Sequence, residues 1–175
     1  MMFSAHPRRE GVKCYLISWL ARQLPAGAME AFERDHEGPW LVWEAGPWRP
    51  PPRDRGTLAA DDRRSRDSSG DALALLLAPR PGRTRFEGVR LGRGPENDLV
   101  VDDGTLSRAH LLFRSEEEGW TVEDLRSLNG TRLNGAPLEG RALSLEPGAQ
   151  IEAGAVHLTF YDARGLWLRL RHGVA

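Results

Sequence analysis

The chain has 175 residues, which is enough for one ordinary domain and a smaller appendage but too few for two full enzymes. Its 24 basic and 25 acidic residues leave a net charge of −1, so no overall field draws the chain toward nucleic acid or an anionic membrane. Hydrophobic residues make up 40% and charged residues 28%, values typical of a folded globular protein. Cys14 is the single cysteine, which excludes an internal disulfide and a cysteine-built zinc site and favours a reducing, cytoplasmic setting.

Residues 1–52 are predicted to form a small N-terminal extension that begins with an amphipathic helix. Apolar side chains recur there at helical spacing: Val12, Leu16, Trp19 and Leu20. The apolar run from Cys14 to Ala21 is far shorter than the roughly 20 residues that cross a bilayer, so no membrane span is expected. A cleaved signal peptide is the less favoured interpretation, because Arg22 closes the run at the short end of the usual apolar length.

The second half of this extension, residues 29–52, is rich in tryptophan and proline. These residues are Trp40, Trp43, Trp48, Pro39, Pro47 and Pro50 to Pro52. Proline disfavours a regular helix, so the segment is predicted to be extended or turn-like. The favoured interpretation packs the tryptophans on the helix or the main domain, because an exposed cluster would promote aggregation. The alternative is an exposed docking segment, since tryptophan is enriched at interfaces.

Residues 53–70 are predicted to be a flexible linker between the extension and the main domain. Five arginines and four aspartates intermix there with small residues, and Leu58 is the only large apolar side chain. The cluster from Arg63 to Arg66 is not a strong nucleic-acid signal, because the segment nets only +1 and lacks interleaved aromatics. Thr57 is the only threonine in residues 1–70, and it is a candidate regulatory phosphorylation site.

Residues 71–175 change to short apolar or alternating runs separated by Gly, Pro, Asn and Asp. Candidate strands cover residues 72–78, 84–91, 98–101, 109–114, 119–124, 131–133, 141–145, 150–153, 156–161 and 166–170. Many short strands at this spacing are typical of an all-β sandwich or barrel. No long internal repeat is visible in the sequence, which excludes a propeller or a solenoid.

Four short motifs lie in order along this β-rich region. They are Leu91-Gly92-Arg93-Gly94 with Glu96-Asn97-Asp98, then Ser107-Arg108-Ala109-His110, then Ser127-Leu128-Asn129-Gly130-Thr131, and finally Asn134-Gly135. Each motif alone is weak, but the ordered set over residues 71–165 closely resembles the forkhead-associated (FHA) domain, a phosphothreonine-binding β-sandwich. The resemblance implies an all-β, FHA-like sandwich of about ten to eleven short strands, preceded by the small helical and tryptophan-rich extension.

The residue chemistry agrees with a phosphate ligand. A phosphothreonine carries about −1.5 to −2 charges and three strong acceptor oxygens, so its binding surface needs a guanidinium group, hydroxyls and amide donors. Arg93, Ser107, Arg108 and Asn129 supply these groups in predicted turns between strands. The resemblance implies that Arg93 and Ser107 contact the phosphate, that Arg108 supports it, and that Asn129 binds the peptide backbone. Thr131 is grouped with these phosphopeptide-binding residues.

A second group of residues is expected to shape the site without touching the ligand. These site-architecture residues are Gly92, His110, Gly130, Asn134 and Gly135. The glycines permit positive φ or a close backbone approach, while the resemblance implies that His110 and Asn134 brace the binding loops from behind. Many relatives have a polar residue before the matching asparagine, whereas this chain departs from that pattern with Leu128.

The sequence gives little support to an enzymatic function. Ser107 and His110 lack the strained elbow and the third partner of a nucleophilic catalyst. The glycine-rich run that begins at Gly92 fails the dinucleotide fingerprint at its last glycine, and the five histidines show no metal-ligand spacing. We therefore expect a binding protein that is not an enzyme and needs no cofactor or metal.

The sequence predicts a cytoplasmic, phosphothreonine-dependent adaptor in serine/threonine kinase signalling. Its expected partner is a threonine-phosphorylated protein, either a kinase or a kinase substrate, with no role for nucleic acid. An intramolecular contact with phosphorylated Thr57 is a second mechanism. The alternative from another class is a phospho-independent scaffold or assembly module that uses the tryptophan-rich segment.

Overall fold

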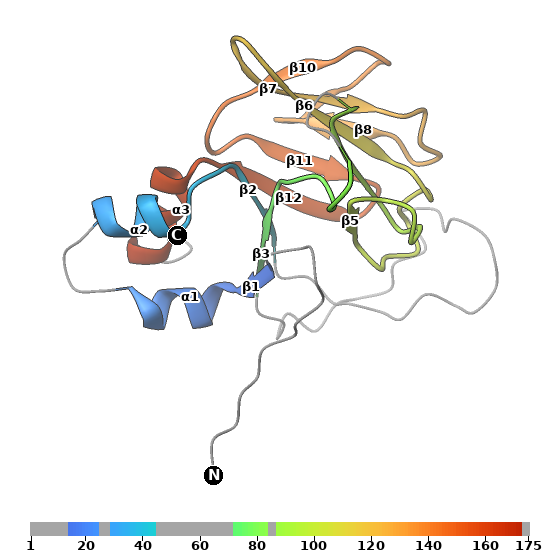
Figure 1. Ribbon diagram of the computed structural model, residues 1–175. Coiled ribbons are helices and arrows are strands. Elements are labelled where there is room, and N and C mark those ends of the chain that lie inside the picture. Colours follow the sequence, from blue (N-terminus) through green and yellow to red (C-terminus); the bar gives the residue numbers. More distant parts are fainter. Residues whose placement is uncertain (1–13, 25–28, 45–71, 84–86, 173–175) are drawn as a thin grey trace.

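Two β-sheets lie face to face in the computed structural model, which describes residues 14–24, 29–44, 72–83 and 87–172 (Figure 1). The first sheet has the order β1 (Cys14–Leu16), β3 (Leu73–Leu76), β2 (Trp40–Trp43), β12 (Val156–Tyr161), β11 (Gln150–Ala153), β8 (Thr131–Leu133) and β9 (Ala136–Pro137). The second has the order β10 (Leu143–Leu145), β7 (Gly119–Asp124), β6 (Leu111–Glu116), β4 (Val89–Gly92) and β5 (Leu99–Val100). Three helices complete the described part of the chain: α1 (Ile17–Gln23), α2 (Met29–Asp35) and α3 (Ala163–His172).

The main core fills the space between the two sheets, as the alternating sequence pattern predicts. In β12, Val156, Leu158 and Phe160 are buried while His157 faces solvent. Leu91 and Phe113 of the second sheet are fully buried in the same cluster. Complete burial of one such side chain contributes about 1.5–3 kcal/mol. The predicted FHA-like β-sandwich is therefore confirmed, with strands close to the predicted ranges in the second half of the chain.

The C-terminal segment differs from its prediction, because residues 166–170 belong to helix α3 and not to a strand. Leucines at 166, 168 and 170 alternate, which favours a strand, yet Leu166 and Leu170 also lie four residues apart on one helical face and are buried. Asp162 decides between the two readings: it is the N-cap of α3, and its Oδ1 accepts the backbone N–H of Gly165 at 2.6 Å. This capping bond begins the helix directly after β12.

The N-terminal segment also differs in detail from its prediction. Cys14–Leu16 pairs with β3 as a strand, and the expected helix begins only at Ile17. The expectation that residues 29–52 are extended or turn-like is wrong for Met29–Asp35, which forms helix α2 ahead of the first proline of that segment, Pro39. Trp40–Trp43 is an interior strand that pairs with β3 on one side and β12 on the other. Trp40 is buried, and its Nε1 donates to the His36 carbonyl at 3.0 Å. The described part of the predicted extension is thus joined to the sandwich by backbone hydrogen bonds.

A second apolar cluster packs the three helices against β2 and β3. Its buried members are Leu20, Phe32, Trp40, Val42, Ala72, Ala74, Leu166 and Leu170. Tyr15 stacks on the exposed Trp19, with ring centroids 5.4 Å apart. None of the helices in the described ranges has the length and apolar character needed to cross a membrane. Trp48, the predicted linker 53–70 and Thr57 lie outside the described residues.

A polar clasp ties the end of β2 to the C-terminal helix. The Glu44 carboxylate accepts a hydrogen bond from the Thr159 hydroxyl at 2.7 Å and forms an ion pair with Arg169. The Arg169 guanidinium also donates to the Tyr161 hydroxyl at 3.3 Å. Both charged side chains are largely shielded from water, so each depends on the other for a partner of opposite charge.

Replacing Glu44 by alanine is expected to lower the free energy of unfolding by about 1–3 kcal/mol, because it leaves a mostly buried guanidinium without its carboxylate. Urea denaturation followed by tryptophan fluorescence measures this loss. Glu118→Ala, in the exposed turn between β6 and β7, is the control and is expected to change little. Equal stability of the two variants would contradict the clasp.

Candidate functional site

Three loops meet at one end of the second sheet because of its strand register. Leu91 near the end of β4 pairs with Leu111 at the start of β6, and Leu111 also pairs with Asp124 at the end of β7. The segments 93–98, 101–110 and 125–130 therefore leave the sheet side by side. These segments, called the rim loops below, carry most of the predicted ligand-binding residues.

Arg93 is held at the start of the first rim loop. Its backbone N–H donates to the Ser107 carbonyl at 3.1 Å, and its Nε donates to the Leu106 carbonyl at 3.0 Å. The half-buried guanidinium thus lies against the loop that carries Ser107. Gly92 makes this approach feasible, because a Cβ at that position would lie 2.3 Å from the Arg108 carbonyl oxygen. Arg93 and Ser107 are brought together, as predicted.

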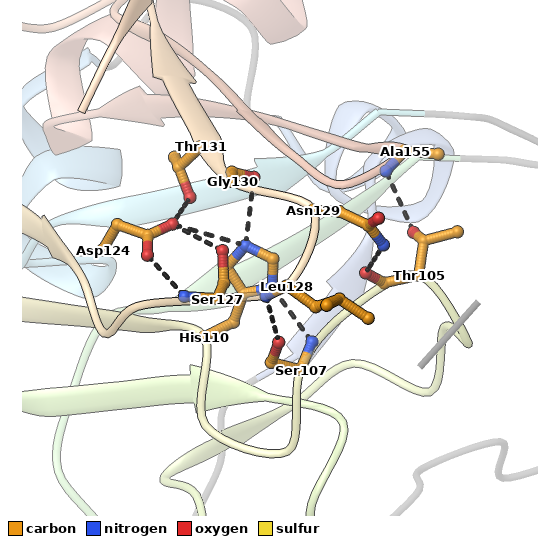
Figure 2. A network of polar contacts seen from close by, with 10 residues as sticks. All are labelled: Thr105, Ser107, His110, Asp124, Ser127, Leu128, Asn129, Gly130, Thr131 and Ala155. Atoms are coloured by element: carbon orange, nitrogen blue, oxygen red, sulfur yellow. Dashed lines mark hydrogen bonds and ion pairs between the residues drawn. The ribbon is translucent and has the colours of Figure 1, made fainter. Parts of the chain in front are cut away.

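His110 lies behind the rim loops and connects two of them (Figure 2). It is 0% exposed. Its Nδ1 accepts the backbone N–H of Ser107 at 3.0 Å, so the ring proton resides on Nε2, which faces the Gly130 carbonyl at 3.3 Å. Burial lowers the pKa of His110 below its ordinary value, although the nearby Asp124 carboxylate and the Gly130 carbonyl oppose this shift. The neutral ring is the form that fits both contacts.

The third rim loop is anchored on the second by polar contacts. Leu128 donates its backbone N–H to the Ser107 hydroxyl oxygen at 3.0 Å, and the Asn129 side-chain amide donates to the Thr105 carbonyl at 2.8 Å. The Thr105 hydroxyl in turn accepts the backbone N–H of Ala155 at 2.9 Å. The hydrogen bond to Ser107 fixes the Leu128 backbone, while the Leu128 side chain is 70% exposed and faces solvent. Ser107 and Asn129 consequently lie on one rim (Figure 2).

Asp124 organises the base of the third rim loop. Its carboxylate accepts the backbone N–H and the hydroxyl of Ser127, both at 2.7 Å, and also the hydroxyl of Thr131. Burial alone would raise the pKa of Asp124, but the hydrogen bonds from Thr131 and Ser127 outweigh it and leave the pKa below its ordinary value. Thr131 is 5% exposed, so the structure places its side chain inside this network and away from the rim.

The first rim loop depends on two buried polar side chains to which sequence reasoning gave no role. The Asn97 amide donates to the Gly94 carbonyl at 2.7 Å and also to the Arg108 carbonyl. The Asp98 carboxylate accepts the backbone N–H groups of Arg80 and Arg90 at 3.0 and 2.8 Å. Their only sequence signal is the Asn-Asp pair after the glycine-rich turn, a pattern equally typical of an ordinary turn.

Arg108 and Glu96 form an ion pair across the rim. The Arg108 Nε lies 3.2 Å from Glu96 Oε1, and the side chains are 71% and 46% exposed. The predicted supporting arginine therefore lies on the same rim as Arg93. In the described ranges, no cluster of three or more His, Cys, Asp or Glu side chains is arranged to hold a metal ion.

Two predicted architecture residues lie elsewhere. Asn134 and Gly135 form the turn between β8 and β9, with φ of 50° and 82°. The Asn134 Oδ1 accepts the backbone N–H of Gln150 at 2.8 Å. They brace the end of β8 that points away from the rim loops, whereas Gly130, with φ of 71°, lies within the third rim loop.

Comparison with known proteins identifies the family. Residues 89–154 match the model of the FHA domain. An oxoglutarate dehydrogenase inhibitor from Corynebacterium glutamicum is 41% identical over 109 residues, which cover 60% of this chain and 75% of that protein. The protein of the same name from Corynebacterium diphtheriae is 37% identical over 92 residues, and the match spans only 59% of its length and 53% of this chain.

A solved structure from work on phosphothreonine-dependent FHA domain interactions is 30% identical to this chain. That match covers 46% of this chain and 85% of the solved one, with a TM-score of 0.41. The residues that match the family model include all three rim loops. The chain belongs to the FHA domain family.

Proposed function

We propose that the chain is a non-enzymatic phosphothreonine reader that docks a threonine-phosphorylated protein in serine/threonine kinase signalling. One observation carries this proposal: the rim loops place the Arg93 guanidinium, the Ser107 hydroxyl and the Asn129 carboxamide on one edge of the sandwich. A guanidinium and a hydroxyl suit the acceptor oxygens of a phosphate, and a carboxamide suits a peptide backbone.

The anchoring of the rim loops supports recognition by a preorganised surface. The Arg93 side chain is held through Nε, and its terminal nitrogens form no hydrogen bond or ion pair with any described residue. Those donors are available to a phosphate, together with the exposed Arg108. Each charge-assisted hydrogen bond contributes about 1.5–3 kcal/mol net, so an unphosphorylated threonine that lacks two of them binds roughly two to four decades more weakly.

The geometry changes the expected roles of two residues. We assign Thr131 to site architecture, since its hydroxyl donates to Asp124 inside the network. Asp124 joins His110 as a residue that holds the loops. The phosphopeptide-binding set that we propose is therefore Arg93, Ser107, Arg108 and Asn129.

The relatives suggest the kind of partner. Two of them are named as inhibitors of oxoglutarate dehydrogenase, so a reader of this family acts on a metabolic enzyme in those organisms. We infer that this chain is likewise a cytoplasmic regulator that controls a protein partner by binding it. A kinase, a kinase substrate and the chain's own phosphorylated Thr57 each present the required phosphothreonine.

The phospho-independent scaffold is the second candidate function. The described part of the tryptophan-rich segment weakens it, because Trp40 is buried in the sheet and offers no surface for docking. A pull-down with and without phosphatase separates the two functions. Loss of partners after dephosphorylation supports the reader, whereas retained partners support the scaffold.

Arg93→Ala is expected to weaken binding of a phosphothreonine peptide by roughly two to four decades, because the guanidinium supplies the charge-assisted bonds. Fluorescence anisotropy with a peptide selected from an oriented phosphothreonine library measures the dissociation constant. Arg164→Ala, on the exposed face of α3, is the charge-matched control and should bind as the wild type does. Unchanged affinity of a folded Arg93→Ala variant would refute the proposed site.

Acidification is expected to destabilise the rim through His110. The folded chain holds the pKa of His110 below its ordinary value of about 6.5, so below that pH the unfolded chain binds a proton that the folded chain does not. The free energy of unfolding should therefore be lower at pH 5.5 than at pH 7.5, and His110→Asn should reduce this difference. An NMR titration that places the pKa of His110 at or above 6.5 in the folded chain would contradict the neutral ring.

A further inference from the structure

The carboxylate of Glu96 occupies the same rim as the arginines that are proposed to bind phosphate. We propose that Glu96 is a resident anion of this site: its carboxylate pairs with Arg108 and must give way when a phosphorylated threonine binds, so that Glu96 sets the affinity. This inference rests on the proposed reader function and adds an affinity-determining residue to it. The supporting observations are one ion pair, one glycine and the charges around them.

The ion pair gives the first observation. Glu96 Oε1 lies 3.2 Å from the Nε of Arg108, so the carboxylate already pairs with the guanidinium that is proposed to bind a phosphate oxygen. Most of the Arg108 side chain faces solvent, so the guanidinium can turn toward a ligand without disturbing the core. The backbone of Arg108 stays fixed meanwhile, because its carbonyl accepts hydrogen bonds from Gly94 and Asn97.

Gly94 gives the second observation. A Cβ built at Gly94 would lie 2.5 Å from Oε2 and 2.6 Å from Oε1 and Cδ of Glu96. The carboxylate therefore fills the space that a side chain at position 94 would need. Because Gly94 follows Arg93 directly, this seat brings the carboxylate to the loop that carries the main phosphate-binding arginine. A residue with a Cβ at this position would displace the carboxylate, which is the mobile end of a flexible side chain.

The local charges give the third observation. The pKa of Glu96 lies below its ordinary value, first because of a backbone hydrogen bond and then because of the hydrogen bond from Arg108 and the positive charges of Arg108 and Arg93. The carboxylate thus responds to both guanidinium groups, as a bound anion would. It is ionised at neutral pH and repels a second anion at short range.

The exposure of the pair limits the size of the effect. Exposed ion pairs are weak, so a dianionic phosphate that gains several charge-assisted hydrogen bonds can displace the carboxylate. Removing the competition should strengthen phosphopeptide binding about two- to fivefold, the range that corresponds to one exposed pair. The gain should shrink with salt, because screening at high ionic strength shortens the reach of exposed charges to a few ångströms.

Two variants that act on the carboxylate in different ways test this inference. Glu96→Gln removes its charge, while Gly94→Ala keeps the charge and pushes the carboxylate out of its seat. Both should bind the library-selected phosphothreonine peptide about two- to fivefold more tightly than the wild type in 50 mM NaCl, and the gain should fall in 500 mM NaCl. Glu118→Gln, at the opposite end of β6 and β7, makes the same charge change and should leave the affinity unchanged.

A double-mutant cycle shows whether Arg108 is the group that Glu96 occupies, and it does not depend on Gly94→Ala folding well. In an Arg108→Ala background, Glu96→Gln should lose more than half of its gain, because there is no guanidinium left to release. If Glu96→Gln keeps more than half of its gain in affinity in this background, Glu96 acts through its negative charge in general and not through Arg108. That result would overturn the inference.

The remaining outcomes are distinguishable as well. If the wild type binds no phosphothreonine peptide, the proposed function fails, and the resident anion fails with it. If the wild type binds and Arg93→Ala does not, but Glu96→Gln is neutral or weaker, the reader stands and only this inference is overturned. If Glu96→Gln binds the phosphopeptide more tightly but a folded Gly94→Ala variant does not, the position of the carboxylate over Gly94 does not matter for binding, and the inference is overturned as well.

Discussion

The rim depends on one buried, neutral imidazole. His110 accepts the Ser107 backbone N–H on one ring nitrogen and presents the other to the Gly130 carbonyl, so one side chain satisfies a donor from the second loop and an acceptor from the third. Leaving the Ser107 N–H buried without a partner costs about 1–3 kcal/mol, whereas the Gly130 carbonyl also accepts the Gly154 backbone N–H at 3.2 Å. An acidic side chain at neutral pH could only accept, and a lysine could only donate. The geometry of the rim loops therefore depends on the protonation state of a fully buried residue.

Around this imidazole the chain separates support from recognition. Asn97 and Asp124 are buried and form hydrogen bonds with the first and third rim loops, and buried Asp98 ties the first rim loop to the backbone of β4. Arg108 is mostly exposed, and Arg93 is bonded through Nε, which leaves its terminal nitrogens without a hydrogen bond or ion pair to any described residue. Loops that are fixed before binding lose less conformational entropy when a ligand arrives, so more of the contact energy remains as affinity.

The sequence predicts most of the sandwich for a physical reason, whereas the resemblance of its ordered motifs to the FHA domain implies the residues of the rim. Half-buried strands alternate apolar and polar residues, and β12 shows this pattern plainly. The position of Trp40–Trp43 inside the first sheet does not follow from the sequence. This strand pairs with β3 and β12, and no local pattern reveals pairing between segments so far apart in the chain. The leucines at 166, 168 and 170 alternate as in a strand, but Leu166 and Leu170 also lie on one face of a helix. Only tertiary burial and the Asp162 cap decide between a strand and a helix.

Side-chain direction is the other limit of sequence reasoning, and Thr131 illustrates it. The motif order places Thr131 near Asn129, but Asn129 lies in the third rim loop, whereas Thr131 is the buried first residue of β8 and its hydroxyl donates to Asp124. Glu96 shows the same limit in a loop, where a carboxylate among residues that are proposed to bind phosphate has no evident use until its position over Gly94 is known. A chain with a net charge of −1 cannot attract a phosphate by its overall field. Its selectivity must therefore come from a few charges at hydrogen-bond distance, where one carboxylate beside two guanidinium groups is a large fraction of the local field.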